Sequence, residues 1–363
     1  MQHAGNHQPT PGGLLLPVSA TLKGRVRWQV LDERGLPEVP RSPSGFALAP
    51  AEGVEQPNLI TDLGLDQIAA FDCFGTSPDS SATWRRYLAV GTGSTVPANG
   101  DTTLAAEVQR ANSSGSFSSG TTTYELDTDD NVWRATSLVT RIVTMTEDRN
   151  LAEFGLSPAS SAAVGIRELL RDSEGDPITV SLLNGKTLRV DHTLTIELPA
   201  PVAGTPATIN VNQYDAGNNL VGSTPYDVVH GGYVRNSANE ERLARLFGVW
   251  NPAPNHSYSS PQNCFHDSSP AAYSRTTSNS GSAASTPVQE TYVSGSRQRI
   301  KRATFAAGTA VGPIYGFRFR INTEAQNAWD AGWRVVFSSP ASYVKANTDT
   351  LRVGIVSTWA RAA

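Results

Sequence analysis

The sequence predicts a mainly β chain: two β-sandwich-like domains with a few short helices and an extended N-terminal arm. Only 17% of the 363 residues are charged, while 31 glycines and 23 prolines punctuate short apolar runs. In several runs apolar and polar residues alternate, which is the pattern of a strand with one buried face. Turn residues between such runs are typical of an all-β fold.

The length of the chain exceeds what one ordinary domain needs, so we expect two domains. We divide the chain into an N-terminal extension or arm (residues 1–57), a first β domain (58–200) and a second β domain (201–363). The boundary lies in the Pro/Ala-rich stretch from Pro199 to Thr208, which is typical of a hinge.

Charge and hydropathy exclude two classes of partner. The net charge of −4 and the pI near 5.9 lack the excess of Lys and Arg that nucleic-acid binding uses, so we expect no nucleic acid partner. No run approaches the ~20 apolar residues that cross a bilayer, so we expect no membrane insertion. Residues 1–13 lack the basic and apolar regions of a secretion signal, which predicts a protein made in a cytoplasm.

Residues Thr21 to Leu31 predict a strand followed by a turn at Glu33-Arg34-Gly35. Its apolar face carries Leu22, Val26, Trp28 and Val30. Two interpretations of this strand are open. It pairs with a neighbouring subunit, as an arm that ties an assembly together, or it pairs within its own chain.

Residues 58–110 predict two short helices around one strand. Thr61 or Asp62 caps a helix with Leu65, Ile68 and Ala69 on one side. Tyr87 to Val90 predicts a strand that Gly91-Thr92-Gly93 ends. Asp101 stands where a second helix needs a cap, with Glu107 and Arg110 close enough to pair on its outer face.

Three segments of this region carry a recognisable order of residues. They are T-x-x-G-L-x-x-I-A from Thr61, A-V-G-T-G-x-T-x-P from Ala89, and D-T-x-L-A-x-E-V-x-R from Asp101. Together with Val139 to Arg141, Glu153 to Leu156 and Ile178 to Leu198, they resemble the N-terminal attachment domain of bacteriophage tail-collar and tail-fibre proteins. The resemblance covers residues 58 to 200. The motif residues are Gly64, Leu65, Gly91, Gly93, Thr102, Leu104, Glu107 and Arg110.

This resemblance implies a structural protein of a tailed bacteriophage virion. Such a protein attaches or forms a tail, collar, neck, baseplate or fibre component in the virion, after synthesis in the host bacterial cytoplasm. The expected partners are other copies of itself and other phage tail or neck proteins. The resemblance implies no cofactor and no enzymatic activity.

The rest of the first domain predicts a loop and more strands. Asn112 to Thr123 is a Gly/Ser/Thr loop, and strands follow at Trp133 to Met145 and Ile166 to Leu170. Ile178 to Leu198 predicts a hairpin around Asn184-Gly185, the dipeptide that favours a type I′ turn. His192 falls on its apolar face, where we expect a buried neutral histidine with one satisfied N–H.

The second domain predicts strands around Ile209 to Tyr214 and Tyr226 to Val229. Ser237 and Glu240 form a capping box for a helix. Pro254 to Ser296 predicts a long loop. Residues from Lys301 to Val353 repeat the order of parts seen from Val139 to Val190, which suggests a diverged duplication of the first domain.

Two groups of side chains were considered as metal sites. Asp127, Asp129 and Asp130 lack the glycine and distal Glu of a calcium loop, and the grouping of His256, Cys264 and His266 near Asp267 lies in a Ser/Pro tract too loose for zinc. We therefore predict no metal. Cys73 and Cys264 are far apart in sequence and predict two unpaired thiols.

Two common catalytic motifs are absent from the sequence. The chain has neither G-x-S-x-G nor H-E-x-x-H, and nothing identifies a pair of glycosidase carboxylates, so we predict no enzyme. An alternative function is a carbohydrate- or host-receptor-binding module, with host surface glycan as partner. Its candidate surface-contact aromatics are Trp250, Tyr258, Phe265 and Tyr273.

Overall fold

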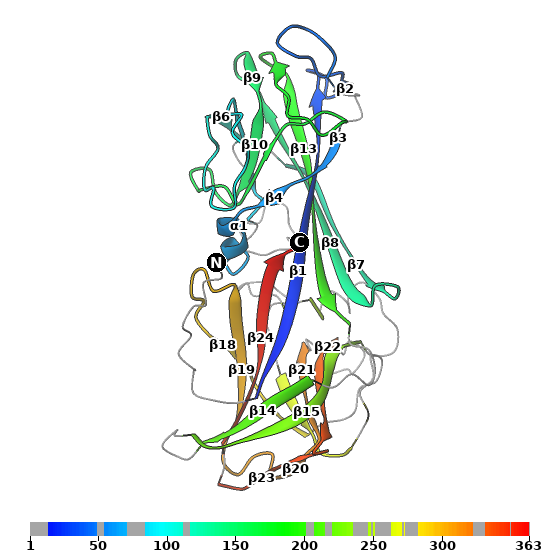
Figure 1. Cartoon of the computed structure of the whole chain (residues 1–363), viewed down its shortest axis with the longest axis vertical. Helices are drawn as coiled ribbons and strands as arrows, with labels where there is room; N and C mark the ends of the chain where they lie inside the picture. The colour runs from blue at the N-terminus through cyan, green and yellow to red at the C-terminus, as the bar shows by residue number, and fades with distance from the viewer. Residues whose placement is uncertain are drawn as a thin grey trace. The chain divides into compact units, whose positions relative to one another are not determined.

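The computed structural model describes residues 14–48, 54–70, 84–111, 117–200, 207–214, 220–234, 246–247, 250, 263–270, 272, 282–321, 331–348 and 350–362. In these residues the chain is mainly β, as the sequence predicted, with the short helix α1 (Asp62–Gln67) and helical residues at 246, 247 and 250 (Figure 1). No helix in this part of the chain is both long enough and apolar enough for a bilayer crossing.

The largest sheet has nine strands, and its main path is β18-β19-β24-β1-β13-β8-β7, with β2 and β3 beside β1. Alternation places every second residue of β13 in the core, so that Leu188, Leu194 and Leu198 are fully buried. The strands are β1 (Leu14–Leu31), β2 (Pro37–Glu38), β3 (Val54–Pro57), β7 (Phe117–Asp127), β8 (Val132–Thr144), β13 (Thr187–Pro199), β18 (Val288–Gln289), β19 (Gln298–Phe305) and β24 (Leu351–Arg361).

Two further sheets have the orders β4-β11-β10-β5-β6 and β14-β15-β22-β21-β16-β17, and two small ones pair β9 with β12 and β20 with β23. In the first the strands are β4 (Leu59–Ile60), β11 (Ile166–Leu169), β10 (Glu153–Ser157), β5 (Tyr87–Gly91) and β6 (Glu107–Arg110). In the second they are β14 (Ala207–Tyr214), β15 (Leu220–Val234), β22 (Ala331–Ser339), β21 (Gly316–Ile321), β16 (Asn263–Asp267) and β17 (Ser282–Ser285). The small sheets contain β9 (Arg149–Leu151), β12 (Val180–Leu182), β20 (Gly312–Ile314) and β23 (Tyr343–Lys345).

The chain divides into two compact units that are not contiguous in sequence. Unit A contains Thr21–Thr123, Thr136–Ile196 and Ala360–Ala363; unit B contains Met1–Ala20, Tyr124–Ala135 and Glu197–Trp359. The expected domains 58–200 and 201–363 are each close to one unit but do not coincide with it. The reason is that the long strands β1, β7, β8, β13 and β24 contribute residues to both units.

The residues from Leu14 to Leu31 are a central strand and not an arm. β1 lies between β24 and β13 and also pairs with β2 and β3, so the interpretation in which this strand pairs within its own chain describes it. Its predicted apolar face is buried throughout, because a central strand packs one whole face against the core.

The first predicted helix is confirmed and the second is wrong. In α1 the Thr61 Oγ1 accepts a hydrogen bond from the Gly64 N–H at 3.1 Å. Between Asp101 and Arg110, by contrast, the chain is a loop that leads into strand β6. Tertiary hydrogen bonds described below take the N–H groups that a helix would use.

The predicted hairpin around Asn184-Gly185 is wrong in its pairing. The turn is present, with Gly185 at φ 82° and the Lys186 N–H donating to the Leu183 carbonyl at 3.0 Å. However, β12 pairs with β9 while β13 belongs to the nine-stranded sheet. Alternation fixes which face of a strand is buried but not which strand lies beside it.

Two predicted loops contain strands. Asn112 to Thr123 overlaps β7, and Pro254 to Ser296 contains β16, β17 and β18. β7 and β17 are rich in Ser, Thr and Ala, and β16 and β18 are too short to show a clear apolar period. The capping box at Ser237 and Glu240 lies outside the described residues, whereas the predicted strands at Ile209 and Tyr226 are confirmed.

Candidate functional site

The motif residues of unit A surround one exposed loop, residues 92–106, which joins β5 to β6. Its outward side chains carry no charge and are mostly small. The exposed residues are Thr92, Ser94, Thr95, Val96, Ala98, Asn99, Gly100, Thr102, Thr103, Ala105 and Ala106. Val96 is 68% exposed, which is high for a large apolar side chain. We call this segment the 92–106 loop.

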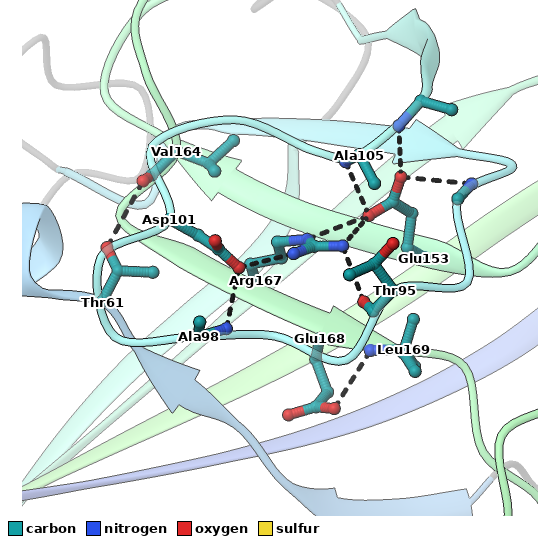
Figure 2. A network of polar contacts seen from close by, with 12 residues as sticks. Thr61, Thr95, Ala98, Asp101, Ala105, Glu153, Val164, Arg167, Glu168 and Leu169 are labelled. Atoms are coloured by element: carbon teal, nitrogen blue, oxygen red, sulfur yellow. Dashed lines mark hydrogen bonds and ion pairs between the residues drawn. The ribbon is translucent and has the colours of Figure 1, made fainter.

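A buried carboxylate holds the loop from beneath. Glu153, on β10, has no exposed surface, and its carboxylate accepts three backbone hydrogen bonds from the loop (Figure 2). Oε1 accepts from Gly93 at 3.2 Å and from Ala106 at 2.8 Å, and Oε2 accepts from Ala105 at 3.1 Å. One side chain therefore fixes both ends of the loop.

Arg167, on β11, completes this network and compensates the buried negative charge. Its Nε donates to Glu153 Oε2 at 3.0 Å, and its Nη2 lies 2.9 Å from the same oxygen. Nη2 also donates to the Thr95 carbonyl at 2.8 Å, and Nη1 binds the Asp101 carboxylate (Figure 2). The planar guanidinium thus ties the middle of the loop to the sheet, a task for which a point charge such as Lys has the wrong geometry.

Asp101 adds a second carboxylate to the network. Burial alone would raise the pKa of Asp101, but the Ala98 N–H and the Arg167 guanidinium outweigh burial and hold that pKa below its usual value. The Ala98 N–H lies 2.8 Å from Oδ2. Asp101 therefore links two parts of the loop through the Ala98 N–H and binds Arg167, and it does not cap a helix.

Three motif glycines are required because a side chain would clash. A Cβ at Gly91 would lie 2.7 Å from Glu153 Oε1, and one at Gly93 would lie 2.4 Å from the same atom. A Cβ at Gly64, in α1, would lie 2.0 Å from the Gly165 carbonyl oxygen. The motif spacing therefore records where the backbone must approach the network and where α1 must approach the start of β11.

The remaining motif residues fix the loop from its apolar side and at its end. Leu65 and Leu104 are buried, and the Thr102 carbonyl accepts the Val164 N–H at 2.9 Å. Glu107 and Arg110 pair at 2.7 Å, as predicted, although they lie on a strand and not on a helix. Arg110 also donates to the Ser157 hydroxyl and to the carbonyls of Ala159 and Ala162, which anchors β6.

The network fixes the backbone of an exposed loop. Each ionisable group of the network is engaged by another group of the protein, and the side chains that the loop exposes most are uncharged, while the Asp101 side chain is 25% exposed. Among the described residues no group of three or more His, Cys, Asp or Glu side chains is placed to hold a metal ion.

The predicted surface aromatics are not all at the surface. Trp250 is fully buried and donates from Nε1 to the Thr358 carbonyl at 3.3 Å, so its assignment as a contact residue is wrong. Phe265 is half-buried, with the Arg320 guanidinium 4.4 Å from its ring centroid. Tyr258 and Tyr273 lie outside the described residues.

His192 is buried, as predicted, but its hydrogen bonding differs from the prediction. Nδ1 lies 2.9 Å from Arg85 Nη1 and acts as an acceptor, while Nε2 has no hydrogen-bond partner among the described residues. Burial and the charges of Arg85 and Arg141 lower the pKa of His192 well below its usual value. A neutral imidazole in the core is the result.

The other candidate groups have structural partners. Asp127 accepts the N–H groups of Asp129 and Asp130 at 3.0 Å each, and it pairs with Arg134 at 2.8 Å. Cys264 is a buried free thiol on β16 whose pKa burial raises well above its usual value. Cys73 and His256 lie outside the described residues.

The sequence did not reveal the part that Glu153 and Arg167 play. In the sequence, Glu153 is only the first residue of the motif segment Glu153 to Leu156, and Arg167 is one polar position of the predicted strand Ile166 to Leu170. Both stand next to apolar residues in short strands that are buried along their whole length, E-F-G-L-S and I-R-E-L. An opposite charge in each of two neighbouring buried strands was the available signal.

Comparisons with protein-family models, with curated proteins and with solved structures gave no match to this chain.

Proposed function

We propose that this protein is a structural component of a tailed bacteriophage virion, attaching or forming part of a tail, collar or fibre. It would act through contacts with other copies of itself and with neighbouring virion proteins. The proposal starts from the resemblance of residues 58 to 200 to the attachment domain of tail-collar and tail-fibre proteins.

One observation supports this proposal most. The motif residues Gly91, Gly93, Thr102 and Leu104 lie in or directly beside the exposed 92–106 loop, whose backbone Glu153 and Arg167 hold. A buried ion pair is costly to desolvate, and breaking it costs about 3–5 kcal/mol. A loop that must keep one shape to fit a partner gives a reason for burying such a pair beneath it despite the desolvation cost.

The loop itself has the properties of a protein contact. It has an apolar side chain, Val96, at an exposed position among small polar residues. A preorganised backbone lowers the conformational entropy lost on association. Burial of the Val96 side chain would then stabilise the assembly through the hydrophobic effect.

Substitution of Val96 by Asp tests this function. The Val96→Asp side chain points to solvent in the isolated chain, so we expect an unchanged melting temperature but a loss of the homo-oligomer in native mass spectrometry. Leu183→Asp is the matched control, since Leu183 is 55% exposed at a turn of the same unit. Oligomers that persist in Val96→Asp would remove the loop from the interface.

The carbohydrate- or host-receptor-binding alternative is a second outcome of the same measurements. A wild-type chain that is strictly monomeric at all concentrations and binds host surface glycans would favour that alternative. The burial of Trp250 removes one of the four aromatic residues on which it was based.

A further inference from the structure

Units A and B contain the same strand order in their smaller sheets. In unit A the path is β4-β11-β10-β5-β6, and in unit B the path β15-β22-β21-β16-β17 follows the additional edge strand β14. In each unit the two central strands are preceded and followed in sequence by two short strands that pair with each other. These short strands are β9 and β12, before β10 and after β11, and β20 and β23, before β21 and after β22. The order along the chain is also the same.

The register of the strands agrees residue by residue. In unit A, Glu153 lies opposite Gly91 and Arg167 lies opposite Gly155. In unit B, the same positions pair Gly316 with Asp267 and Arg334 with Arg318. Arg334 is therefore the counterpart of Arg167.

Backbone hydrogen bonds outside the strand ladders give the same equivalence. The Ala152 N–H donates to the Gly91 carbonyl at 2.9 Å, and the Leu170 N–H donates to the Ala152 carbonyl at 2.8 Å. In unit B the matching bonds run from Tyr315 to Asp267 at 2.8 Å and from Phe337 to Tyr315 at 3.0 Å.

Arg334 makes two of the three kinds of contact that Arg167 makes, to a buried carboxylate and to a loop carbonyl, and has no counterpart of Asp101 among the described residues. Its Nε and Nη2 lie 3.2 and 3.1 Å from Asp267 Oδ2, and its Nη1 donates to the Ala272 carbonyl at 3.2 Å. Both Arg334 and Asp267 are buried. As in unit A, a buried arginine–carboxylate pair holds a carbonyl of the segment that follows the strand.

The carboxylate has changed strands between the two units. In unit A it is on β10 with a glycine, Gly91, opposite; in unit B it is on β16 with a glycine, Gly316, opposite. A Cβ on either glycine would approach the carboxylate, at 2.7 Å from Glu153 Oε1 and at 3.3 Å from Asp267 Oδ2. Side chains that face each other on paired strands are close neighbours, so a carboxylate from either position reaches the same arginine.

We infer that Asp267 and Arg334 are a second loop-positioning centre, and that units A and B are two copies of one module. The described residues that follow β16 then form a second surface for contact with another copy of this chain, equivalent to the 92–106 loop. These residues, Ser268, Ser269, Pro270 and Ala272, are exposed and uncharged, as are the most exposed residues of the first loop. The contact role rests on the proposed function, whereas the positioning role does not.

Amide hydrogen exchange of the full chain tests the positioning role. Arg334→Lys keeps the charge but cannot form all the bonds of the guanidinium, so we expect the Tyr315 amide to exchange at least ~10-fold faster, with β14 and β15 unchanged. Arg167→Lys should have the same effect on the Ala152 amide only. Arg352→Lys and Arg189→Lys, on β24 and β13, are the matched controls.

Arg318 Nε also lies 2.9 Å from Asp267, and it can hold the carboxylate in Arg334→Lys. Asp267→Asn weakens both contacts and is therefore the second, stronger variant. A Tyr315 amide that exchanges at the wild-type rate in folded Arg334→Lys and Asp267→Asn overturns the positioning role. The positioning role is also overturned if exchange becomes faster by the same factor at all amides of unit B, Tyr315 included.

Native mass spectrometry of Ala272→Asp tests the contact role. We expect Ala272→Asp to weaken assembly, as Val96→Asp does. If only Val96→Asp weakens it, the second surface is wrong and the proposed function stands. If neither variant does, both surfaces are removed from the interface, and a strictly monomeric wild-type chain contradicts the proposed function itself. The exchange data decide the positioning role in either case.

Discussion

At the scale of single residues, the charged side chains in the core determine the form of the site. Glu153 and Arg167 are buried in short apolar strands, where each is tolerated because the other compensates its charge and satisfies its hydrogen bonds. The motif glycines and Leu104 could be predicted as site residues from the sequence. The pairing of Glu153 with Arg167 could not, because 14 residues separate them and only the β10–β11 register brings them together.

Replacing Glu153 by Gln measures this compensation. A neutral amide keeps the shape but leaves Arg167 without its buried partner charge and offers one acceptor oxygen instead of two. We expect Glu153→Gln to lower the free energy of unfolding by about 3–5 kcal/mol in urea denaturation. Glu55→Gln, in the exposed pair with Arg25, should change it by less than about 1 kcal/mol. Equal stability of the two variants would contradict the account.

Lys301 predicts a pH dependence in unit B. It is buried on β19, and burial, with a smaller contribution from the charge of Arg299, lowers its pKa to about 7. Between pH 7 and the unfolded pKa near 10.5 the unfolded chain binds a proton that the folded chain does not. Stability from this group therefore rises with pH, and is lowest below pH 7.

Lys301→Met removes the contribution of Lys301 to the pH dependence of the free energy of unfolding. Thermal melting between pH 7 and 8.5 should show a higher melting temperature for the variant at pH 7, and a gap to the wild type that narrows as pH rises. A gap that stays constant or widens would show that Lys301 is charged in the folded chain.

At the scale of elements, the sequence predicted strands and one helix well, but their neighbours poorly. Leu188 to Leu198 alternates strictly, and β13 has the predicted buried face. The expected pairing of β13 with β12 across the Asn184-Gly185 turn was wrong, because β12 pairs with β9. The segment from Asp101 to Arg110 has helix formers, yet two of its N–H groups, those of Ala105 and Ala106, bind Glu153, and these tertiary bonds override the local preference.

Helix α1 allows a test in which two effects have opposite signs. Replacing glycine by alanine within a helix stabilises it by about 0.5–1 kcal/mol. At Gly64, however, the new Cβ would lie 2.0 Å from the Gly165 carbonyl oxygen, and overpacking costs about 1–3 kcal/mol. We expect Gly64→Ala to destabilise unit A in urea denaturation.

Gly100→Ala is the control, since a Cβ at Gly100 has nothing within 4 Å. It should leave the midpoint of unfolding unchanged. A Gly64→Ala variant more stable than the wild type would mean that α1 does not pack closely against the residues before β11.

At the scale of the whole molecule, the mainly β class could be predicted because alternation and turn residues are local properties of the sequence. The division into units could not, because β1, β7, β8, β13 and β24 each contribute to both. The suspected duplication is supported by the equivalent registers around Arg167 and Arg334. The order of parts in the sequence suggested the duplication, but it could not match the two buried pairs, because the carboxylate partner stands on a different strand in each unit.

The central claim is that the 92–106 loop is held ready to contact another molecule. Within the loop, the backbone N–H groups of residues 94–96 have no hydrogen-bond partner among the described residues, so they exchange quickly in an isolated chain. Amide hydrogen exchange measured at high and at low protein concentration tests the claim directly, with Ser44 and Gly45 in an exposed turn as an internal reference. The account predicts slower exchange of 94–96 at high concentration and no change in the reference turn. Equally fast exchange of 94–96 in an assembled sample would contradict it.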